Sequence, residues 1–155
     1  MTDSMVAVLQ TMVIAMAPVV ELRGAIPVGI ALGLPFPVVF AAAYVGNMLP
    51  VPFIILFIRR IFAFLRKSRH LGPLIERLER KAHLNGRKVN KYKTLGLFIF
   101  VAIPLPGTGA WAGALVAAFL DIRLRNALPA IACGVLVAGI LVSLITYSAL
   151  FAINL

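Results

Sequence analysis

The residues with the clearest chemical potential are a glutamate and an arginine, Glu21 and Arg23, inside a long apolar run that also holds Gly24 and Pro27. A charged side chain at the centre of a membrane helix costs about 2.5–3.5 kcal/mol, so such groups usually pair or line a water-filled cavity. There a carboxylate can carry a proton or meet a cation, and a guanidinium can bind a phosphate or another acidic group. We therefore interpret Glu21–Pro27 as a functional helix break. The alternative is a structural ion pair, or two charges at the membrane rim.

A second motif brings together proline, glycine, threonine and tryptophan at Pro104, Pro106, Gly107, Thr108, Gly109 and Trp111. No regular helix survives this density of proline and glycine. Glycine lets the backbone approach a ligand, threonine offers a hydroxyl, and tryptophan offers an amphipathic ring, although such a ring more often fills the protein core. At such a break the N-terminal end of a helix attracts anions and the C-terminal carbonyls attract cations. We predict that both breaks contribute to one substrate or ion site.

The composition places these breaks in a membrane protein. The 155 residues are 62% hydrophobic and 13% charged, whereas soluble domains are about 45–50% apolar and about 25% charged. The formal charge is +10, and twelve of the 15 lysines and arginines lie between Arg59 and Lys93. A basic segment between apolar spans is the positive-inside signal, so we expect it to be cytoplasmic and to hold anionic lipid headgroups. No aromatic platform interleaves these charges, so we expect no nucleic-acid partner.

Nothing in the sequence has the pattern of an enzyme or a metal site. The single cysteine, Cys133, can form no intrachain disulfide, and no Cys/His spacing suits a metal. There is no acid pair, no nucleophile with a placed histidine and no phosphate-binding loop of the Walker type. We expect no enzymatic activity, no metal and no cofactor.

The first half of the chain is predicted to hold a hairpin and a span. Residues 5–34 fit a re-entrant helical hairpin, because the apolar run before Glu21 is too short to cross a hydrocarbon core of roughly 30 Å. A plain spanning helix with its charges at the interface is the alternative. Residues 36–58 are long enough to span the membrane, with kinks expected at Pro50 and Pro52.

The second half repeats this order after the basic segment. Within the linker, 59–93, the pattern over 73–84 predicts an amphipathic helix at the cytoplasmic membrane surface, with a solvated linker as the alternative. Residues 95–120 predict a second re-entrant hairpin, because two short apolar pieces flank the Pro/Gly break. Asp121 is expected to cap the last helix, and residues 126–155 are long enough to span.

These elements predict an all-α integral membrane protein with a single membrane domain over 1–155. Each half is a re-entrant hairpin followed by a transmembrane helix, and a cytoplasmic linker gives the halves opposite topologies. Inverted repeats with broken helices that meet near the midplane are typical of transporters. We expect a multi-pass protein of the cell membrane with both termini outside. Small-xxx-small spacings such as Gly109/Gly113 suit tight helix packing and leave a homo-oligomer open.

The two broken segments, Glu21–Gly29 and Ile103–Trp111, resemble the small multidrug export protein family, which is similar to a branch of the DedA/VTT superfamily. The resemblance implies two re-entrant helices that face each other and a transporter-like role, with lipid flipping or scrambling assigned to DedA relatives. Those relatives carry an acidic residue in the first hairpin, which Glu21 matches. They also carry arginines around the second loop, whereas residues 100–111 contain none. Arg23 is the candidate substitute.

Three functions follow from this reading. The first is a small transporter that translocates a lipid or another small amphipathic substrate, with ion or proton coupling. The second is a small multidrug efflux protein, which needs an acidic residue in an aromatic-lined pocket; Glu21, Trp111 and Tyr44 are the candidates. The third is a membrane scaffold that transports nothing. A flux assay in vesicles separates the third from the other two.

Overall fold

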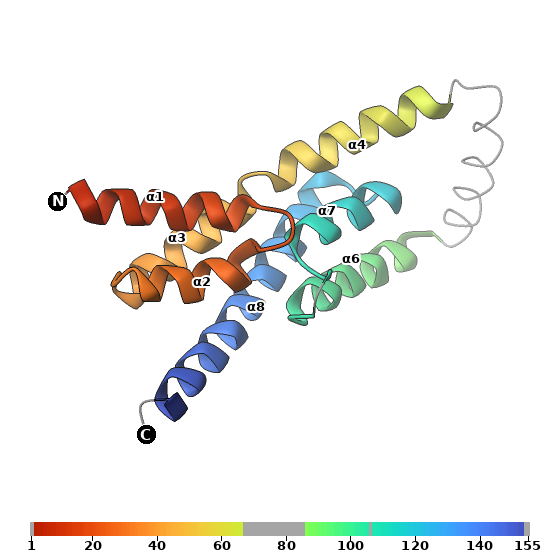
Figure 1. The fold of residues 1–155 in the computed structure, drawn as a ribbon. Coiled ribbons are helices and arrows are strands. Elements are labelled where there is room, and N and C mark those ends of the chain that lie inside the picture. The colour runs from red at the N-terminus through yellow and green to blue at the C-terminus, as the bar shows by residue number, and fades with distance from the viewer. Residues whose placement is uncertain (1, 67–85, 106, 154–155) are drawn as a thin grey trace.

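The structure is a computed structural model that describes residues 2–66, 86–105 and 107–153. In that part of the chain every regular element is an α-helix (Figure 1), as the sequence predicted. The amphipathic helix expected over 73–84 lies outside the described residues. In chain order the helices are α1 (Thr2–Met16), α2 (Glu21–Ala31), α3 (Phe36–Met48), α4 (Val51–Arg66), α6 (Gly86–Ala102), α7 (Ala110–Phe119) and α8 (Leu124–Ile153).

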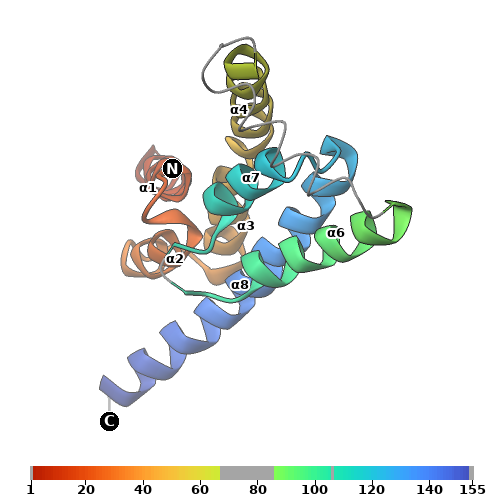
Figure 2. The same ribbon diagram turned by 90° about the vertical axis from the view of Figure 1, so that its right-hand side faces the viewer.

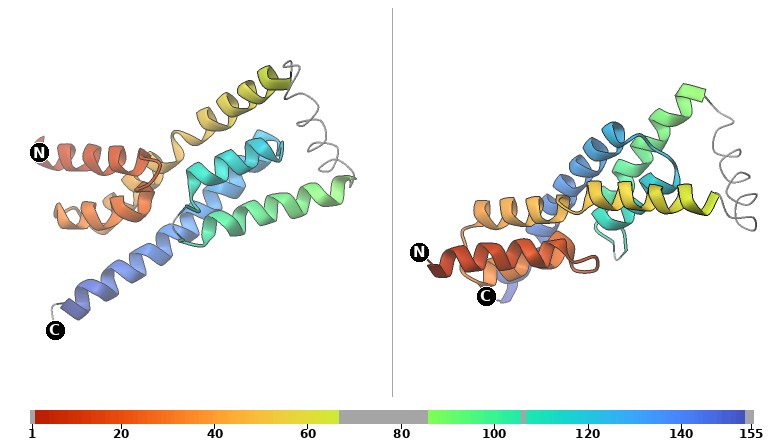
Figure 3. Two further views of the ribbon diagram at one scale, coloured as in Figure 1. Left: turned by 45° about the vertical axis from the view of Figure 1, so that its right-hand side comes forward. Right: turned by 90° about the horizontal axis from the view of Figure 1, so that it is seen from above.

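Two helical hairpins, α1–α2 and α6–α7, point their turns toward each other near the middle of the molecule (Figure 3). The first hairpin packs against α3, and the second packs against α8 and α4. Viewed from the side, α8 runs between α1–α2 and α6 (Figure 2). Two segments, Phe36–Ile61 and Leu124–Ala152, are long and apolar enough to cross a membrane. They coincide with the two spans that the sequence predicted.

The first of these spans is interrupted where prolines were expected to kink it. Helix α3 ends at Met48 and α4 begins at Val51. Pro50 has no N–H to continue the helix, whereas Pro52 lies in the first turn of α4, where no donor is needed. The carbonyl of Pro50 accepts the N–H of Ile54 at 2.9 Å and so starts the new helix.

The first break lies earlier than predicted. Residues 17–20 form the non-helical turn, and α2 begins at Glu21 and continues through Pro27. The prediction of a break over Glu21–Pro27 was therefore wrong. Pro18 already stands in the turn, and Pro27 removes only the single hydrogen bond that would reach the carbonyl of Arg23. Charge and break remain adjacent, but the charges stand on the first turn of a helix.

Helices α2 and α7 end in the same hydrogen-bonded turn. In each, the residue after the C-cap is left-handed, Gly33 with φ 78° and Asp121 with φ 51°. The N–H one residue further on reaches back five residues, over 3.3 Å after α2 and 2.9 Å after α7. This is the Schellman arrangement. Asp121, predicted as an N-cap of the last helix, instead ends the helix before it.

The buried face of α3 corresponds to a buried face of α8 at an interval of 88 residues. Tyr44 and Ala132, which touch each other, are 88 residues apart. Each buried residue of α3 likewise has a buried counterpart 88 residues later on α8. They are Val39, Ala42, Ala43, Gly46 and Asn47 on α3, and Ala127, Ala130, Ile131, Gly134 and Val135 on α8. Small side chains allow close packing here: a Cβ on Gly46 would lie 2.4 Å from the carbonyl oxygen of Met12 on α1.

Candidate functional site

The carboxylate of Glu21 caps a helix of the opposite hairpin. Glu21 begins α2 with φ 51° and is only 4% exposed. Its Oε1 accepts the backbone N–H of Trp111, the second residue of α7, at 3.2 Å. The first N–H groups of a helix have no partner within the helix and carry partial positive charge. Glu21 therefore supplies from a distance of 90 residues the capping oxygen that local sequence usually supplies.

Gly109 makes room for this carboxylate. A Cβ on Gly109 would lie 1.6 Å from Oε2 of Glu21, and no side chain can occupy that space. The backbone of Gly109 is extended, with φ −146° and ψ −161°, a conformation open to any residue. The glycine is thus required by its contact with Glu21 and not by its backbone angles.

The guanidinium of Arg23 binds the loop between α6 and α7. Its Nη1 donates to the carbonyl of Leu105, and its Nη2 donates to the carbonyl of Thr108 and, at 3.2 Å, to the Thr108 hydroxyl. The carbonyl of Ile103 lies 3.5 Å from Nη2. A guanidinium presents five N–H donors in a fixed fork and can hold several carbonyls at once, and its charge strengthens each hydrogen bond. Arg23 thus holds the loop that follows α6.

The two charges of the first hairpin therefore bind different parts of the second hairpin, Glu21 the N-terminus of α7 and Arg23 the loop between α6 and α7. Within the described residues no Glu21–Arg23 ion pair occurs within 4.0 Å, and the ion pair found there joins Arg59 with Asp121. The structural Glu21–Arg23 pair, weighed as the alternative from the sequence, is not the observed arrangement. Residues two apart on a helix do not face each other, which explains why each side chain reaches its own target.

Thr108 organises the second break. Its hydroxyl donates within the loop, to the carbonyl of Ile103 at 2.6 Å or that of Leu105 at 2.9 Å, and accepts the N–H of Leu105 at 3.2 Å. Gly107 has φ 83°, a left-handed value that favours glycine. The predicted non-helical break over 104–109 is confirmed at the described positions.

The other described residues of the predicted set take no part in these hydrogen bonds. Gly24 packs against the first turn, where a Cβ would lie 2.2 Å from a Val20 methyl, and Pro27 lies inside α2. Pro104 belongs to the second loop, and Pro106 lies outside the described residues. Of the predicted set, the structure brings together Glu21, Arg23, Thr108, Gly109 and Trp111.

Trp111 joins this site to an apolar groove. Its indole Nε1 donates to the carbonyl of Met16 at 3.0 Å, while its ring lines a groove of about 930 Å³. Tyr44, predicted as a second pocket aromatic, donates instead to the carbonyl of Ala132 on α8 at 3.3 Å. The sequence reading missed the aromatics of α4. The groove is lined by Met16, Leu49, Pro50, Phe53, Ile54, Leu56, Phe57, Arg60 and Trp111.

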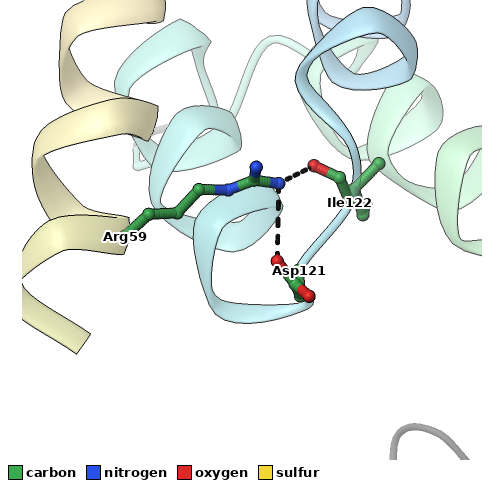
Figure 4. Close-up of polar contacts among 3 residues, drawn as sticks. All are labelled: Arg59, Asp121 and Ile122. Carbon is green, nitrogen blue, oxygen red and sulfur yellow. Dashed lines mark hydrogen bonds and ion pairs between the residues drawn. The ribbon is translucent and has the colours of Figure 1, made fainter. Parts of the chain in front are cut away.

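Arg59 fixes the turn between α7 and α8 (Figure 4). Its Nη2 donates to the carbonyl of Ile122 and lies 3.6 Å from Oδ1 of Asp121. The paired side chains are 29% and 54% exposed, so the ion pair itself contributes about 0–1 kcal/mol. The sequence placed Arg59 at the start of the linker, and only the long-range fold reveals this contact.

Asn47 presents an unpaired amide at the interruption of the first span. It is fully buried at the end of α3, and in the described part of the chain neither its Oδ1 nor its Nδ2 has a hydrogen-bond partner. A buried polar group left unpaired costs about 1–3 kcal/mol. Such groups need an explanation, such as a bound water or a functional role.

Comparison with known proteins identifies the family of the chain. A family profile matches residues 21–141, a stretch that begins with α2 directly after the first break and contains the second break and the greater part of both spans. No curated protein and no solved structure matches the chain. Because the matched stretch covers more than half of the sequence, the chain belongs to the family described as "Putative small multi-drug export protein".

Proposed function

We propose that this protein is a membrane transporter whose substrate site lies between the two breaks, and that it moves a lipid or another amphipathic substrate with proton coupling. The family description names an export protein. The observation that carries the proposal is that Glu21 of one hairpin holds the N-terminus of α7 in the other hairpin, while Arg23 holds the loop before α7. A buried carboxylate on a left-handed backbone is costly, and such strain clusters at functional sites.

The matched halves support inverted repeats. Tyr44 touches Ala132, and Glu21 touches Gly109; each pair is related by the interval of 88 residues. A residue can meet its own counterpart only close to the rotation axis that relates two repeats. Helix α3 runs away from the side that holds the chain termini and α8 runs back toward it (Figure 1), so a two-fold axis that relates them is perpendicular to both. If the two helices cross the membrane, that axis lies in the membrane plane, which is the geometry of inverted-topology transporters.

The helix lengths support re-entrant hairpins. With a rise of 1.5 Å per residue, the 15 residues of α1 span about 22 Å and the 17 residues of α6 about 26 Å, both short of a core of roughly 30 Å. Both chain ends lie on one side of the molecule, and the outer ends of α4 and α6 lie on the other (Figure 1). This arrangement suits a cytoplasmic basic linker with both termini outside.

The proposal of proton coupling rests on the contact between the Glu21 carboxylate and the N-terminus of α7. A helix N-terminus binds anions, and in this structure the α7 N-terminus is held by the Glu21 carboxylate. Protonation removes the charge that favours this contact. An acidic group of the substrate then takes the place of Glu21, and deprotonation later expels it. Proton and substrate thus alternate at the same backbone N–H groups.

Multidrug efflux is the second candidate, and the groove is the observation that favours it. Trp111, bonded to Glu21 through its N–H, shares the groove with Phe53 and Phe57. Aromatic faces beside a carboxylate suit a cationic amphiphile. In this version the cation meets Glu21 directly, and the proton competes with the drug. A scaffold without transport remains the third candidate.

A flux assay in proteoliposomes tests these candidates. We expect the protein to translocate a fluorescent anionic lipid, and Glu21→Gln to abolish the movement. Asp3→Asn is the matched control, because Asp3 is an exposed acid at the start of α1. Movement of a cationic dye with competition by cationic drugs alone would select efflux, and the absence of any flux with folded protein would reject both transport proposals.

A further inference from the structure

The apolar groove beside Trp111 has the length of one membrane leaflet. It begins at the Leu49–Pro50 interruption, in the middle of the span Phe36–Ile61, and follows α4 to Arg60. At 1.5 Å per residue the distance from Leu49 to Arg60 is about 17 Å. This is close to half of a hydrocarbon core of roughly 30 Å. In a membrane that this span crosses, such a groove extends from the bilayer midplane to one membrane surface.

Trp111 lies at the midplane end. Helix α7 packs along α4, and the turn after α7 is held on Arg59 through the carbonyl of Ile122 (Figure 4). Trp111 stands on the first turn of α7, one helix length away from that turn. It therefore faces the Leu49–Pro50 end of the groove, while Arg60 marks the other end.

The lining suits a hydrocarbon chain with an acidic head. Apart from Arg60, the described lining residues are aliphatic, aromatic, sulfur-containing or proline. Its volume of about 930 Å³ lies within the range of about 300–1,000 Å³ for small-molecule sites. Arg60 is exposed, and no hydrogen bond or ion pair to another described residue engages it, whereas Arg59 is fixed on Ile122. A guanidinium in this position can grip a phosphate with two parallel hydrogen bonds.

We propose that this groove binds one acyl chain of an anionic phospholipid from the leaflet on the basic side, with the phosphate on Arg60 and the chain end beside Trp111. The inference rests on the membrane setting of the proposed function. It assigns a position next to the Glu21 site at which a lipid binds before it is transported. Charge complementarity at Arg60 selects the head, and the one-leaflet length selects a chain that ends at the midplane.

Quenching of tryptophan fluorescence by brominated lipids tests this site, because Trp111 is the sole tryptophan. Two vesicle preparations contain the same mixture of phosphatidylglycerol and phosphatidylcholine, and the bromines sit on one lipid or on the other. We expect brominated phosphatidylglycerol to quench Trp111 severalfold more than its mole fraction predicts. Bromines near the chain end should quench more than bromines near the ester.

Quenching by brominated phosphatidylglycerol is divided by quenching by brominated phosphatidylcholine. In Arg60→Gln this ratio should fall to the ratio of the mole fractions of the two lipids. Arg125→Gln should leave the preference intact, because it removes an equal charge from an exposed position at the start of α8, away from the groove. Arg60→Lys keeps the charge without the bidentate grip and should retain part of the preference. If Arg60→Gln does not fold, the position-dependent quenching of the wild-type protein still decides the matter.

Three results would overturn the proposal. Quenching in proportion to mole fraction in the wild-type protein would remove headgroup selection. No quenching by either lipid would mean that protein, such as a second copy of the chain, covers the groove. An unchanged preference in Arg60→Gln would reject the role of that arginine. Failure of the proposed transport function can be distinguished from failure of this lipid site, because Glu21→Gln should lose flux and keep the lipid preference.

Discussion

The carboxylate of Glu21 rests directly on the α-carbon of Gly109, so closely that a Cβ there would lie 1.6 Å from Oε2. The contact joins the first residue of α2 to the N-cap of α7, and thus the two hairpins at their turns. Any side chain at position 109 would therefore displace the carboxylate of Glu21. In the proposed mechanism, the position of this carboxylate decides whether the α7 N-terminus is free for a substrate.

Gly109→Ala should therefore displace Glu21 without changing any charge. The lost charge-assisted hydrogen bond amounts to about 1.5–3 kcal/mol, so we expect at least roughly a tenfold loss of transport. The fluorescence of Trp111, which shares the contact, should change as well. Gly96→Ala is the control, because a Cβ on Gly96 in α6 meets nothing within 4 Å. Equal activity of both variants would show that the Glu21 contact is not needed.

Transport should depend on pH through Glu21. Glu21→Gln has no proton to exchange, so its residual flux should stay flat across the pH range in which the wild-type flux varies. Glu21→Asp keeps a carboxylate on a shorter side chain and should keep part of the dependence. Flux in proteoliposomes with the same pH on both sides measures this. A Glu21→Gln variant that retains the wild-type pH profile would assign the coupling to another group.

The two Schellman turns predict that adding a side chain at Gly33 and removing one at Asp121 have opposite effects on stability. Gly33→Ala places a Cβ at φ 78° and should destabilise the fold by about 1–2 kcal/mol. Asp121→Gly removes such a strain at φ 51° and loses an exposed ion pair that contributes about 0–1 kcal/mol. We expect it to be neutral or stabilising. Thermal unfolding in detergent would contradict this if the two variants shifted in the same direction.

The contact of Arg59 with the backbone predicts that the arginine matters more than its acid partner. Arg59→Gln leaves the carbonyl of Ile122 without its cap and should cost about 1–3 kcal/mol. Asp121→Asn removes only the ion pair and should cost at most about 1 kcal/mol. Chemical unfolding of the two variants compares them. Equal losses would mean that the pair, and not the carbonyl contact, holds the turn.

Much of the helical layout could be predicted from the sequence because its signals are local. Proline and glycine over 104–109 end α6, Pro50 interrupts the first span, and the apolar lengths identify Phe36–Ile61 and Leu124–Ala152. The first break was misplaced because Gly24 and Pro27 suggest an interruption that the helix absorbs. The start of α6 at Gly86 was missed because the polar residues there carry no apolar periodicity.

The site itself could be predicted only as a set of residues. Glu21, Arg23, Thr108, Gly109 and Trp111 were named from their types, but local sequence cannot tell which side chain meets which backbone group across some 90 residues. The same limit hid the contact between Arg59 and Ile122 and the aromatics of α4 around the groove. These contacts depend on how the two hairpins meet, which is a property of the whole chain.

The central claim is that Glu21 acts on the N-terminus of α7, that Arg23 acts on the loop before it, and that the two do not serve as a structural pair. The most direct measurement is a double-mutant cycle of flux and folded yield with Glu21→Gln, Arg23→Gln and the double variant. Separate roles predict that both single variants fold, that both lose transport, and that the double variant recovers none of it. If instead each single variant fails to fold, as a broken buried pair costing about 3–5 kcal/mol would cause, and the double variant regains folding and transport, the account is contradicted.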